Sequence, residues 1–315
     1  MKAIEFQKYG EADELQIVDR PRPIPGPEEV LIRIHASGVN SGDWRVRRAE
    51  PFLVRLFFGL FRPKPSARVL GSVLSGVVEE VGDSVDRFLP GDRVFGMSDL
   101  ALGCHAQYIC LPQSAPIVKG LESLGHEEAA SIPFGLHTAH HFLKPLGLQK
   151  GHSLLIVGAS GAVGSAALQL GKILGYDVTA VTSTANVELV KSLGADHVLD
   201  YTKEKLSDLN EPFDAILETV DRTELTLLRS LLKPGGHLVL SSAGMKDMLL
   251  APIRSLLWKR KIHTSVAAVN QEDMEYFKEL IEAGRYRPVL EKTYNMDEVA
   301  EAHRHAEKGH KKGNI

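Results

Sequence analysis

The sequence contains only two cysteines, Cys104 and Cys110, which is too few for a disulfide framework. Its first residues carry charges from the second position onward and lack the apolar core of a signal peptide. The longest apolar run, at residues 51–60, contains Arg55 and is far shorter than the roughly 20 residues that a transmembrane helix needs. These absences predict free thiols, a cytoplasmic location and no membrane partner.

Charge of one sign is not in excess either. The 37 Lys and Arg residues face 40 Asp and Glu residues, and the net charge of −3 predicts no nucleic-acid partner. We interpret the basic clusters at residues 45–48, 258–261 and 311–312 as solvated surface, with polyanion binding as the alternative. A chain of 315 residues, 43% hydrophobic and 24% charged, is typical of a folded protein of about two domains.

Strand-like segments dominate the first third of the chain. In residues 30–35, Val30, Ile32 and Ile34 alternate with Arg33 and His35, which is the period of a half-buried strand. Proline and glycine recur between such segments, as in turns. This part of the sequence therefore predicts an all-β unit.

After about residue 124, short apolar runs alternate with helical segments, which is typical of a parallel sheet with right-handed crossovers. We expect a helix over residues 163–174, ended by Gly175, and beyond residue 272 two amphipathic helices around a strand at 288–290. The predicted fold class is α/β with a doubly wound sheet, whose candidate strands are residues 154–157, 178–182, 215–217 and 238–240.

A glycine-rich turn follows the first of these strands. There, backbone N–H groups at the start of a helix can bind a pyrophosphate. Ser160 replaces the middle glycine of the usual fingerprint, so a simple tight turn is the alternative, although the position at the head of a βαβ series favours nucleotide binding. The predicted cofactor contacts in this turn are Gly158, Ala159, Ser160, Gly161, Ala162 and Val163.

The end of the next strand bears on the choice of cofactor. Its residues Thr182, Ser183, Thr184 and Asn186 offer hydroxyls and an amide, but no carboxylate that would bind the ribose 2′-OH of NAD and repel a 2′-phosphate. This pattern favours NADPH. We expect no Arg or Lys at this corner to pair with the phosphate, so NADH is the alternative.

Several further motifs occur in a characteristic order and spacing, at residues 36–44, 71–79, 90–96, 128–134 and 193–196. With the glycine turn, they give the chain a resemblance to the medium-chain dehydrogenase/reductase superfamily, and in particular to its zinc-free quinone oxidoreductase branch. The resemblance implies a GroES-like domain at residues 1–122 and 277–315, a Rossmann domain at 123–276, and an active site in the cleft between them.

The resemblance also implies an activity, namely hydride transfer from NADPH to a quinone, enone or related carbonyl substrate. Positioning and desolvation would then drive catalysis, with a proton from water or a nearby hydroxyl. It further suggests a homodimer joined through the edge of the Rossmann sheet. The alternatives are an NADP(H)-dependent alcohol or aldehyde reductase, and a nucleotide-binding protein with little turnover.

Individual residues acquire roles by the same resemblance. Asn40 and Thr138 would face the nicotinamide, and the groove for the dinucleotide would be lined by Val220, Ser241 and Ala243. The adenosine phosphate would lie near Ser183, Thr184, Asn186 and Tyr201. The chain departs from its relatives at Asn186, where they carry Lys, and at Arg45, where many carry Tyr.

The resemblance argues against a metal. Zinc alcohol dehydrogenases carry a Cys ligand at the position of Asn40, and a Gly-His-Glu motif where this chain has Gly71, Ser72 and Val73. An amide, a hydroxyl and an isopropyl group do not form a zinc ligand set. We therefore expect no zinc.

Three features keep more than one interpretation. Asp43 is either a general base or a loop anchor that accepts backbone N–H bonds. His137 and His141, four residues apart beside His140, are either a metal pair or proton source, or hydrogen-bonded residues of a surface helix. Trp44 and residues 52–61 either line an entrance for apolar substrates or pack in the core.

Overall fold

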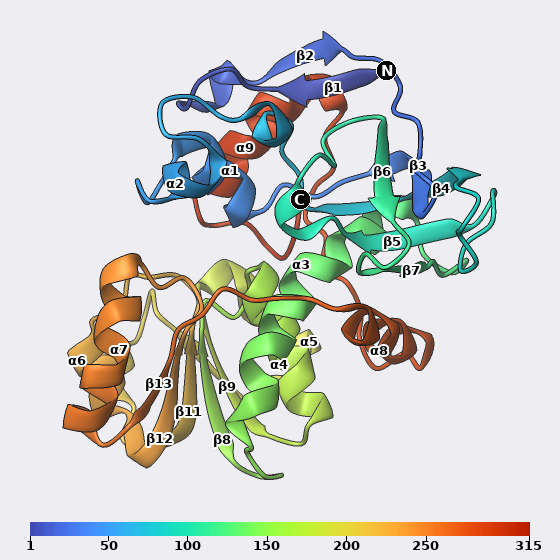
Figure 1. The fold of residues 1–315 in the computed structure, drawn as a ribbon. Helices are drawn as coiled ribbons and strands as arrows, with labels where there is room; N and C mark the ends of the chain where they lie inside the picture. The colour runs from blue at the N-terminus through green and yellow to red at the C-terminus, as the bar shows by residue number, and fades with distance from the viewer. The chain divides into compact units, whose positions relative to one another are not determined.

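The computed structural model describes residues 1–315, apart from the side chains of Asp99 and Met245. The chain forms two compact units (Figure 1). Unit 1 comprises Met1–Phe134 and Val269–Ile315, and unit 2 comprises Gly135–Ala268. The division falls inside helix α3 (His126–Leu143), downstream of the boundary expected at residue 122.

Unit 2 is built on a parallel sheet with the strand order β10-β9-β8-β11-β12-β13. The strands are β8 (Ser153–Val157), β9 (Asp177–Thr182), β10 (His197–Asp200), β11 (Phe213–Glu218), β12 (Leu232–Leu240) and β13 (Lys261–His263). The chain moves outward from β8 in one direction and from β11 in the other. Ligands of such sheets bind beyond the carboxyl ends of the strands at this switch point.

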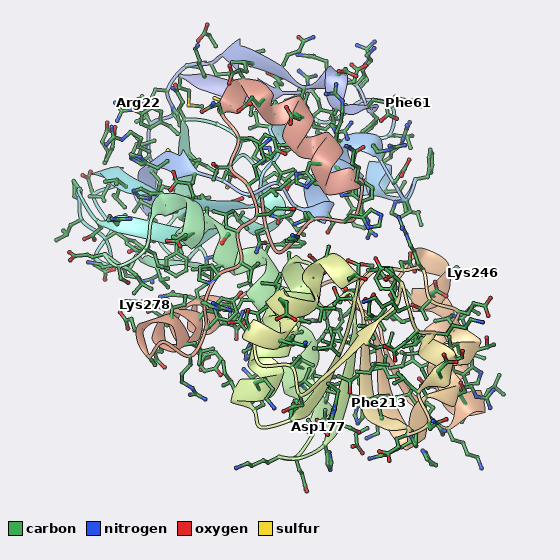
Figure 2. All side chains as sticks on the ribbon, turned by 180° about the vertical axis from the view of Figure 1, so that it is seen from behind. Arg22, Phe61, Asp177, Phe213, Lys246 and Lys278 are labelled. Atoms are coloured by element: carbon green, nitrogen blue, oxygen red, sulfur yellow. The ribbon has the colours of Figure 1, made fainter. Side chains whose placement is uncertain are left out.

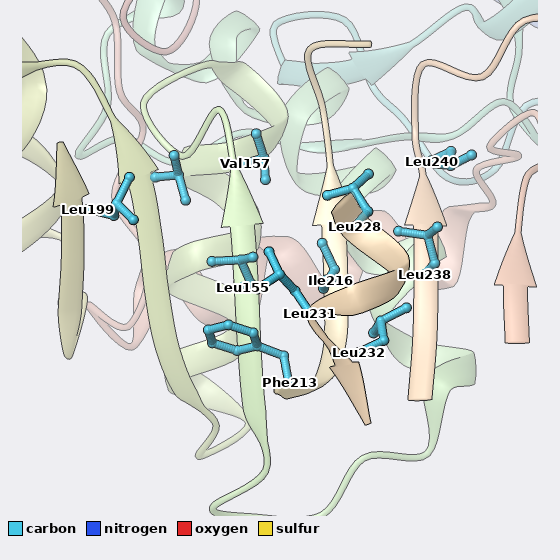
Figure 3. Close-up of a cluster of buried hydrophobic side chains, with 11 residues drawn as sticks. Leu155, Val157, Leu199, Phe213, Ile216, Leu228, Leu231, Leu232, Leu238 and Leu240 are labelled. Atoms are coloured by element: carbon cyan, nitrogen blue, oxygen red, sulfur yellow. The ribbon is translucent and has the colours of Figure 1, made fainter. Parts of the chain in front are cut away.

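The four strands predicted from apolar runs are confirmed, and their side chains form the core of unit 2. Leu155, Ile216 and Leu238 come from three adjacent strands and are fully buried in one cluster (Figure 3). Helix α4 begins and ends within one residue of the predicted bounds, and Gly175 follows it with a φ of +80°. The helices between the strands are α4 (Ala162–Ile173), α5 (Val187–Ser192), α6 (Leu225–Ser230) and α7 (Met245–Trp258).

Unit 1 contains an antiparallel sheet with the strand order β6-β3-β4-β5-β7, and a separate β1-β2 pair. The first strand prediction is confirmed, because β3 spans Glu29–Ala36. The other strands are β1 (Lys2–Glu5), β2 (Gln16–Asp19), β4 (Val73–Val81), β5 (Arg93–Met97), β6 (Tyr108–Pro112) and β7 (Ile117–Lys119).

The prediction that the first third is all β was wrong. Two helices interrupt it, α1 (Ser41–Arg48) and α2 (Val54–Phe58). Helix α1 begins where the Asp43 carboxylate accepts the backbone N–H of Asn40, a local cap that strand periodicity does not reveal. Unit 1 also contains the two predicted amphipathic helices, α8 (Gln271–Glu282) and α9 (Val299–Glu307).

The strand expected at residues 288–290 is reduced to a single bridge between Leu290 and Asn314. Short 3-10 helices complete the fold. They are η1 (Ala12–Glu14), η2 (Pro65–Ala67), η3 (Asp99–Ala101), η4 (Lys144–Leu146), η5 (Thr184–Asn186), η6 (Leu206–Asp208) and η7 (Met296–Glu298).

A buried ion pair joins the two chain segments of unit 1. The Arg47 side chain in α1 is fully buried, donates a hydrogen bond to the Gly10 carbonyl at 2.6 Å and pairs with Glu307 at the end of α9. Burial lowers the pKa of Arg47 to about 10. The pair therefore fixes the C-terminal segment of the unit against the N-terminal one.

Candidate functional site

The glycine turn connects β8 to α4 and needs glycine at two positions. Gly158 has a φ of +82°, and a Cβ on Gly164 would lie 2.1 Å from the Gly158 carbonyl oxygen. At Gly161, a Cβ would meet only that carbonyl oxygen, at 3.5 Å. The turn is therefore closely packed on its inner side and open at Gly161, where the N–H groups of the first turn of α4 begin.

Ser160 links this turn to the end of β9. Its Oγ accepts a hydrogen bond from Asn186 Nδ2 at 3.1 Å, and Ser183 Oγ lies 3.4 Å from the same nitrogen. Within the described side chains, Asn186 Oδ1 and Thr182 Oγ1 are buried without a hydrogen-bond partner. The structure therefore brings these predicted cofactor residues together around the turn.

A carboxylate that the sequence analysis did not consider also lies at this corner. Asp200, at the carboxyl end of β10, accepts hydrogen bonds from Thr184 Oγ1 at 2.5 Å and Thr202 Oγ1 at 2.7 Å. These hydrogen bonds, with one from Lys203, hold the pKa of Asp200 well below its usual value. Tyr201, the next residue, is half exposed.

Lys203 corrects the expectation that no cation stands here. Its Nζ lies 3.4 Å from Asp200 Oδ2, and two-thirds of its side chain is exposed. The missed signal is the parallel register, in which Asp200 pairs with Thr182 and so brings the residues after both strands to one corner. Lys203 follows β10, so the sequence around β9 alone does not reveal it.

The loop after β11 packs on the other side of the turn. A Cβ on Gly158 would lie 2.5 Å from Thr219 Oγ1 and 2.6 Å from Val220 Cγ1. This places the predicted groove residue Val220 against the turn. Ser241 is linked to the same region, because its Oγ donates to the Glu218 carbonyl at 3.1 Å, whereas Ala243 packs against the core cluster of unit 2.

Glu218 holds this loop in place, a role that the sequence analysis missed. Its carboxylate accepts the backbone N–H groups of Val220 at 3.1 Å and Asp221 at 2.8 Å. Burial raises the pKa of Glu218, which is only 2% exposed. An acidic residue at the end of an otherwise apolar buried strand was the available signal.

Thr138 lies half-buried on α3, one turn after Gly135. A Cβ on Gly135 would lie 2.4 Å from the Ala162 carbonyl oxygen, so α3 passes close to the first residue of α4. The ring centroids of His137 and His141 are 6.4 Å apart, and His141 Nε2 is 2.9 Å from Ser265 Oγ. His141 therefore agrees with the hydrogen-bonded interpretation, whereas His137 is buried and not on the surface.

In unit 1, Asn40 and Asp43 form a second group. Asp43 is buried, with Oδ2 accepting the Asn40 N–H at 2.7 Å and Oδ1 accepting the Gly71 N–H at 3.0 Å. Burial raises the pKa of Asp43. These bonds agree with the loop-anchor interpretation. Among the described side chains, the buried Asn40 Nδ2 has no hydrogen-bond partner, so its N–H groups are unused.

Comparison with known proteins supports this description. The family model for an alcohol dehydrogenase GroES-like domain matches residues 26–125, and that for a zinc-binding dehydrogenase matches residues 193–315. The chain is 30% identical to the chloroplastic quinone-oxidoreductase QR1 of Triphysaria versicolor, covering 100% of this chain and 97% of the relative. It is 32% identical to the mitochondrial NAD(P)H oxidoreductase RTN4IP1 of Mus musculus, covering 99% and 88%.

A solved structure agrees with these relatives. The quinone oxidoreductase from Coxiella burnetii superimposes with a TM-score of 0.90 at 28% identity, covering 100% of this chain and 98% of that one. The similarity therefore extends over both unit 1 and unit 2. The chain therefore belongs to the quinone oxidoreductase-like branch of the medium-chain dehydrogenase/reductase superfamily, a family of nicotinamide-dependent oxidoreductases.

Proposed function

We propose that this protein transfers hydride from NADPH to a quinone, an enone or a related carbonyl compound, without zinc. The observation that carries the proposal is the open glycine turn at Gly161, which lies between the Val220 loop and the corner of Ser183, Thr184 and Lys203. The printed names of the relatives, quinone-oxidoreductase and NAD(P)H oxidoreductase, support the reaction class.

The residues of unit 2 fit a dinucleotide. The N–H groups at the start of α4 would hold the pyrophosphate, and the open space beside Gly161 leaves room for it. Val220, Ser241 and Ala243 would line the groove, and Thr138 would contact the nicotinamide. When bound, NADPH supplies the hydride; the residues supply orientation and exclude water.

The preference for NADPH rests on the corner after β9. Ser183 offers a hydroxyl and Lys203 an exposed ammonium, which together suit a 2′-phosphate. Thr184 contributes less, because its hydroxyl proton is directed at Asp200. Lys203 can move from Asp200 to the phosphate, since Thr184 and Thr202 continue to donate to the carboxylate.

Zinc independence rests on the donor set. Asn40 offers a carboxamide, and Val73 is a buried hydrocarbon in β4, so two of the three positions used by zinc enzymes lack a good zinc ligand. The unused N–H groups of Asn40 are suited to donate to a carbonyl oxygen and to stabilise the charge that develops on it. Asp43 then acts as a positioning residue, because it fixes the backbone of Asn40.

The proposal extends to assembly and location. We infer a homodimer joined through β13, one of the two strands at the ends of the sheet order; in the described structure β13 has only β12 as a neighbour, as β10 has only β9. A reducing cytoplasm suits the two thiols, whose pKa values burial raises to about 12 for Cys104 and about 11 for Cys110.

The test is titration of the protein with NADPH and NADH, followed by nicotinamide fluorescence, and then addition of 9,10-phenanthrenequinone. Tight NADPH binding with oxidation on addition of quinone is expected. Binding without oxidation would direct attention to enones, aldehydes or a role without turnover. No binding of either nucleotide would contradict the proposal.

A pair of substitutions at Gly161 sharpens this titration. Its φ of −77° and open surroundings accept a side chain, so neither variant should disturb the fold. G161D places a carboxylate where the pyrophosphate would lie and should weaken NADPH binding at least about tenfold. G161A is the matched control, and we expect it to retain most of the affinity.

A further inference from the structure

The segment from residue 51 to residue 64, named here the α2 loop, exposes an unusual amount of apolar surface. Its outward side chains are Phe52 at 64%, Leu56 at 60%, Phe57 at 72%, Leu60 at 47% and Phe61 at 83% exposure. Figure 2 shows Phe61 at the outer rim of its unit. Neighbouring apolar residues exposed together mark an interaction surface rather than ordinary scatter.

The α2 loop is held in a defined shape. Val54 and Phe58, on the inner side of α2, pack against the apolar cluster around Phe6 and Leu70. Tyr9 donates a hydrogen bond to the Gly59 carbonyl at 2.7 Å. The outward side chains are therefore displayed by a loop that is anchored to the core of unit 1.

Positive charge surrounds this apolar surface. Residues 51–78 contain Arg55, Arg62, Lys64 and Arg68, and no Asp or Glu, although the whole chain has a net charge of −3. Within the described part of the chain, no carboxylate forms an ion pair with Arg55, Arg62 or Lys64. Lys64 instead donates to the Phe57 carbonyl at 3.0 Å. The α2 loop is thus an apolar surface with uncompensated basic charge.

We propose that the α2 loop docks this protein on the surface of an anionic lipid bilayer. Phe57 and Phe61 enter the interfacial layer, where aromatic side chains are favoured, and Arg62 and Lys64 contact lipid phosphates. The docking is peripheral, because no described helix is long and apolar enough to cross a bilayer. Composition predicts no membrane partner only because it tests for spanning segments. This inference goes beyond the proposed function and does not depend on it.

A second copy of the chain fits this surface less well. A twofold contact between two copies would bring their α2 loops together. Arg62 and Lys64 of one copy would then repel the same residues of the other. The α7 helix exposes another apolar group, Leu249, Ile253, Leu256 and Leu257. That group precedes β13, the strand assigned above to the dimer. It is used below as a control, because it exposes apolar side chains outside the α2 loop.

The test is sedimentation of the full chain with vesicles of phosphatidylcholine alone, or of phosphatidylcholine mixed with phosphatidylserine. We expect binding to the anionic vesicles only, and a decrease as sodium chloride screens the charges. The double variant F57S/F61S should lower the partition coefficient by about tenfold or more. R62Q/K64Q should lower it by about tenfold on anionic vesicles at low salt.

Two controls separate this surface from others. I24S removes a lone apolar side chain, 87% exposed, from the same unit, and L249S/L256S removes the α7 group; both should bind vesicles like the wild type. The urea-unfolding midpoint of each variant checks that it folds.

Three results would overturn the proposal. In the first, F57S/F61S binds anionic vesicles as strongly as the wild type. In the second, only L249S/L256S loses binding. In the third, the wild-type protein does not bind anionic vesicles. Dissociation of an oligomer by F57S/F61S without lipid would assign the α2 loop to a second copy instead.

Discussion

Asp43 at the start of α1 and Gly71 just before β4 are joined by a hydrogen bond of 3.0 Å from the Gly71 N–H to Asp43 Oδ1. Gly71 has a φ of +89°, and a Cβ there would lie 2.5 Å from His105 Cδ2. The Asp43 carboxylate therefore binds the backbone of a residue at which any side chain would clash with His105. Its other oxygen fixes Asn40, so one side chain positions two parts of unit 1.

Replacing Asp43 tests this anchoring role. D43N loses one acceptor and should lower the free energy of unfolding by about 2 kcal/mol, measured by urea denaturation. D83N, at an exposed aspartate, is the control and should have no effect. Unchanged stability of D43N together with loss of hydride transfer would favour the general-base interpretation instead.

Lys203 is expected to distinguish the two nucleotides. K203A should weaken NADPH binding by about tenfold and change NADH binding by less than about twofold, because only NADPH carries the 2′-phosphate. Stabilisation by adenosine 2′-phosphate in a thermal-shift assay gives a readout apart from turnover. K205A, at an exposed lysine two residues away, is the matched control. Equal losses for both nucleotides would show that Lys203 does not contact the phosphate.

Glu218 is expected to control the loop over the glycine turn. E218A leaves the N–H groups of Val220 and Asp221 without their acceptor, and Asp221 has a φ of +56°. The variant should lose about 2 kcal/mol of stability and bind NADPH about tenfold more weakly. E218Q, which keeps one acceptor oxygen, should fall between E218A and the wild type. If E218A binds NADPH as tightly as the wild type, the loop after β11 does not contribute to cofactor binding.

His303 in α9 should make the protein sensitive to acid. It is fully buried, and burial together with His105 and Arg47 lowers its pKa to about 2. In the unfolded chain the pKa of a histidine is about 6.5. Below this pH, His303 binds a proton in the unfolded chain but stays neutral in the folded protein. Stability should therefore fall by up to about 1.4 kcal/mol per pH unit as the pH decreases from 6.5.

The variant H303L removes this titration, and its stability should decline less than that of the wild type between pH 6.5 and pH 4.5, by about 2 kcal/mol. The same urea curves measured over pH provide the test. H310L, at an exposed histidine, should keep the wild-type slope. Parallel pH profiles for H303L and the wild type would place the acid sensitivity elsewhere.

The parallel sheet of unit 2 was predictable from sequence because its signals are short in range. Leu155 and Ile216 belong to apolar runs long enough for a buried strand, and Gly158 and Gly164 mark the turn within a few residues. Such local signals do not depend on which strands become neighbours. The α/β class and the positions of β8, β9, β11 and β12 therefore follow from local apolar runs, the helical periodicity between them and the glycine turn.

Other parts depend on neighbours that periodicity cannot identify. Lys203 joins the corner of Thr184 only through the pairing of β9 with β10, and Gly71 meets Asp43 only in the folded unit. Helix α1 escaped the strand-based prediction because its start depends on one side-chain cap. Tertiary pairing and local capping thus decided the features that the sequence analysis missed.

The ion pair between Arg47 and Glu307 has a consequence for synthesis on the ribosome. Unit 2 is made between the two segments of unit 1, and at about 5–20 residues per second this delay is on the order of ten seconds. During that time, burying Arg47 would leave its guanidinium without Glu307, its ion-pair partner, which is unfavourable. Unit 2 can therefore fold as a continuous segment while the nascent N-terminal part stays open, and unit 1 closes last.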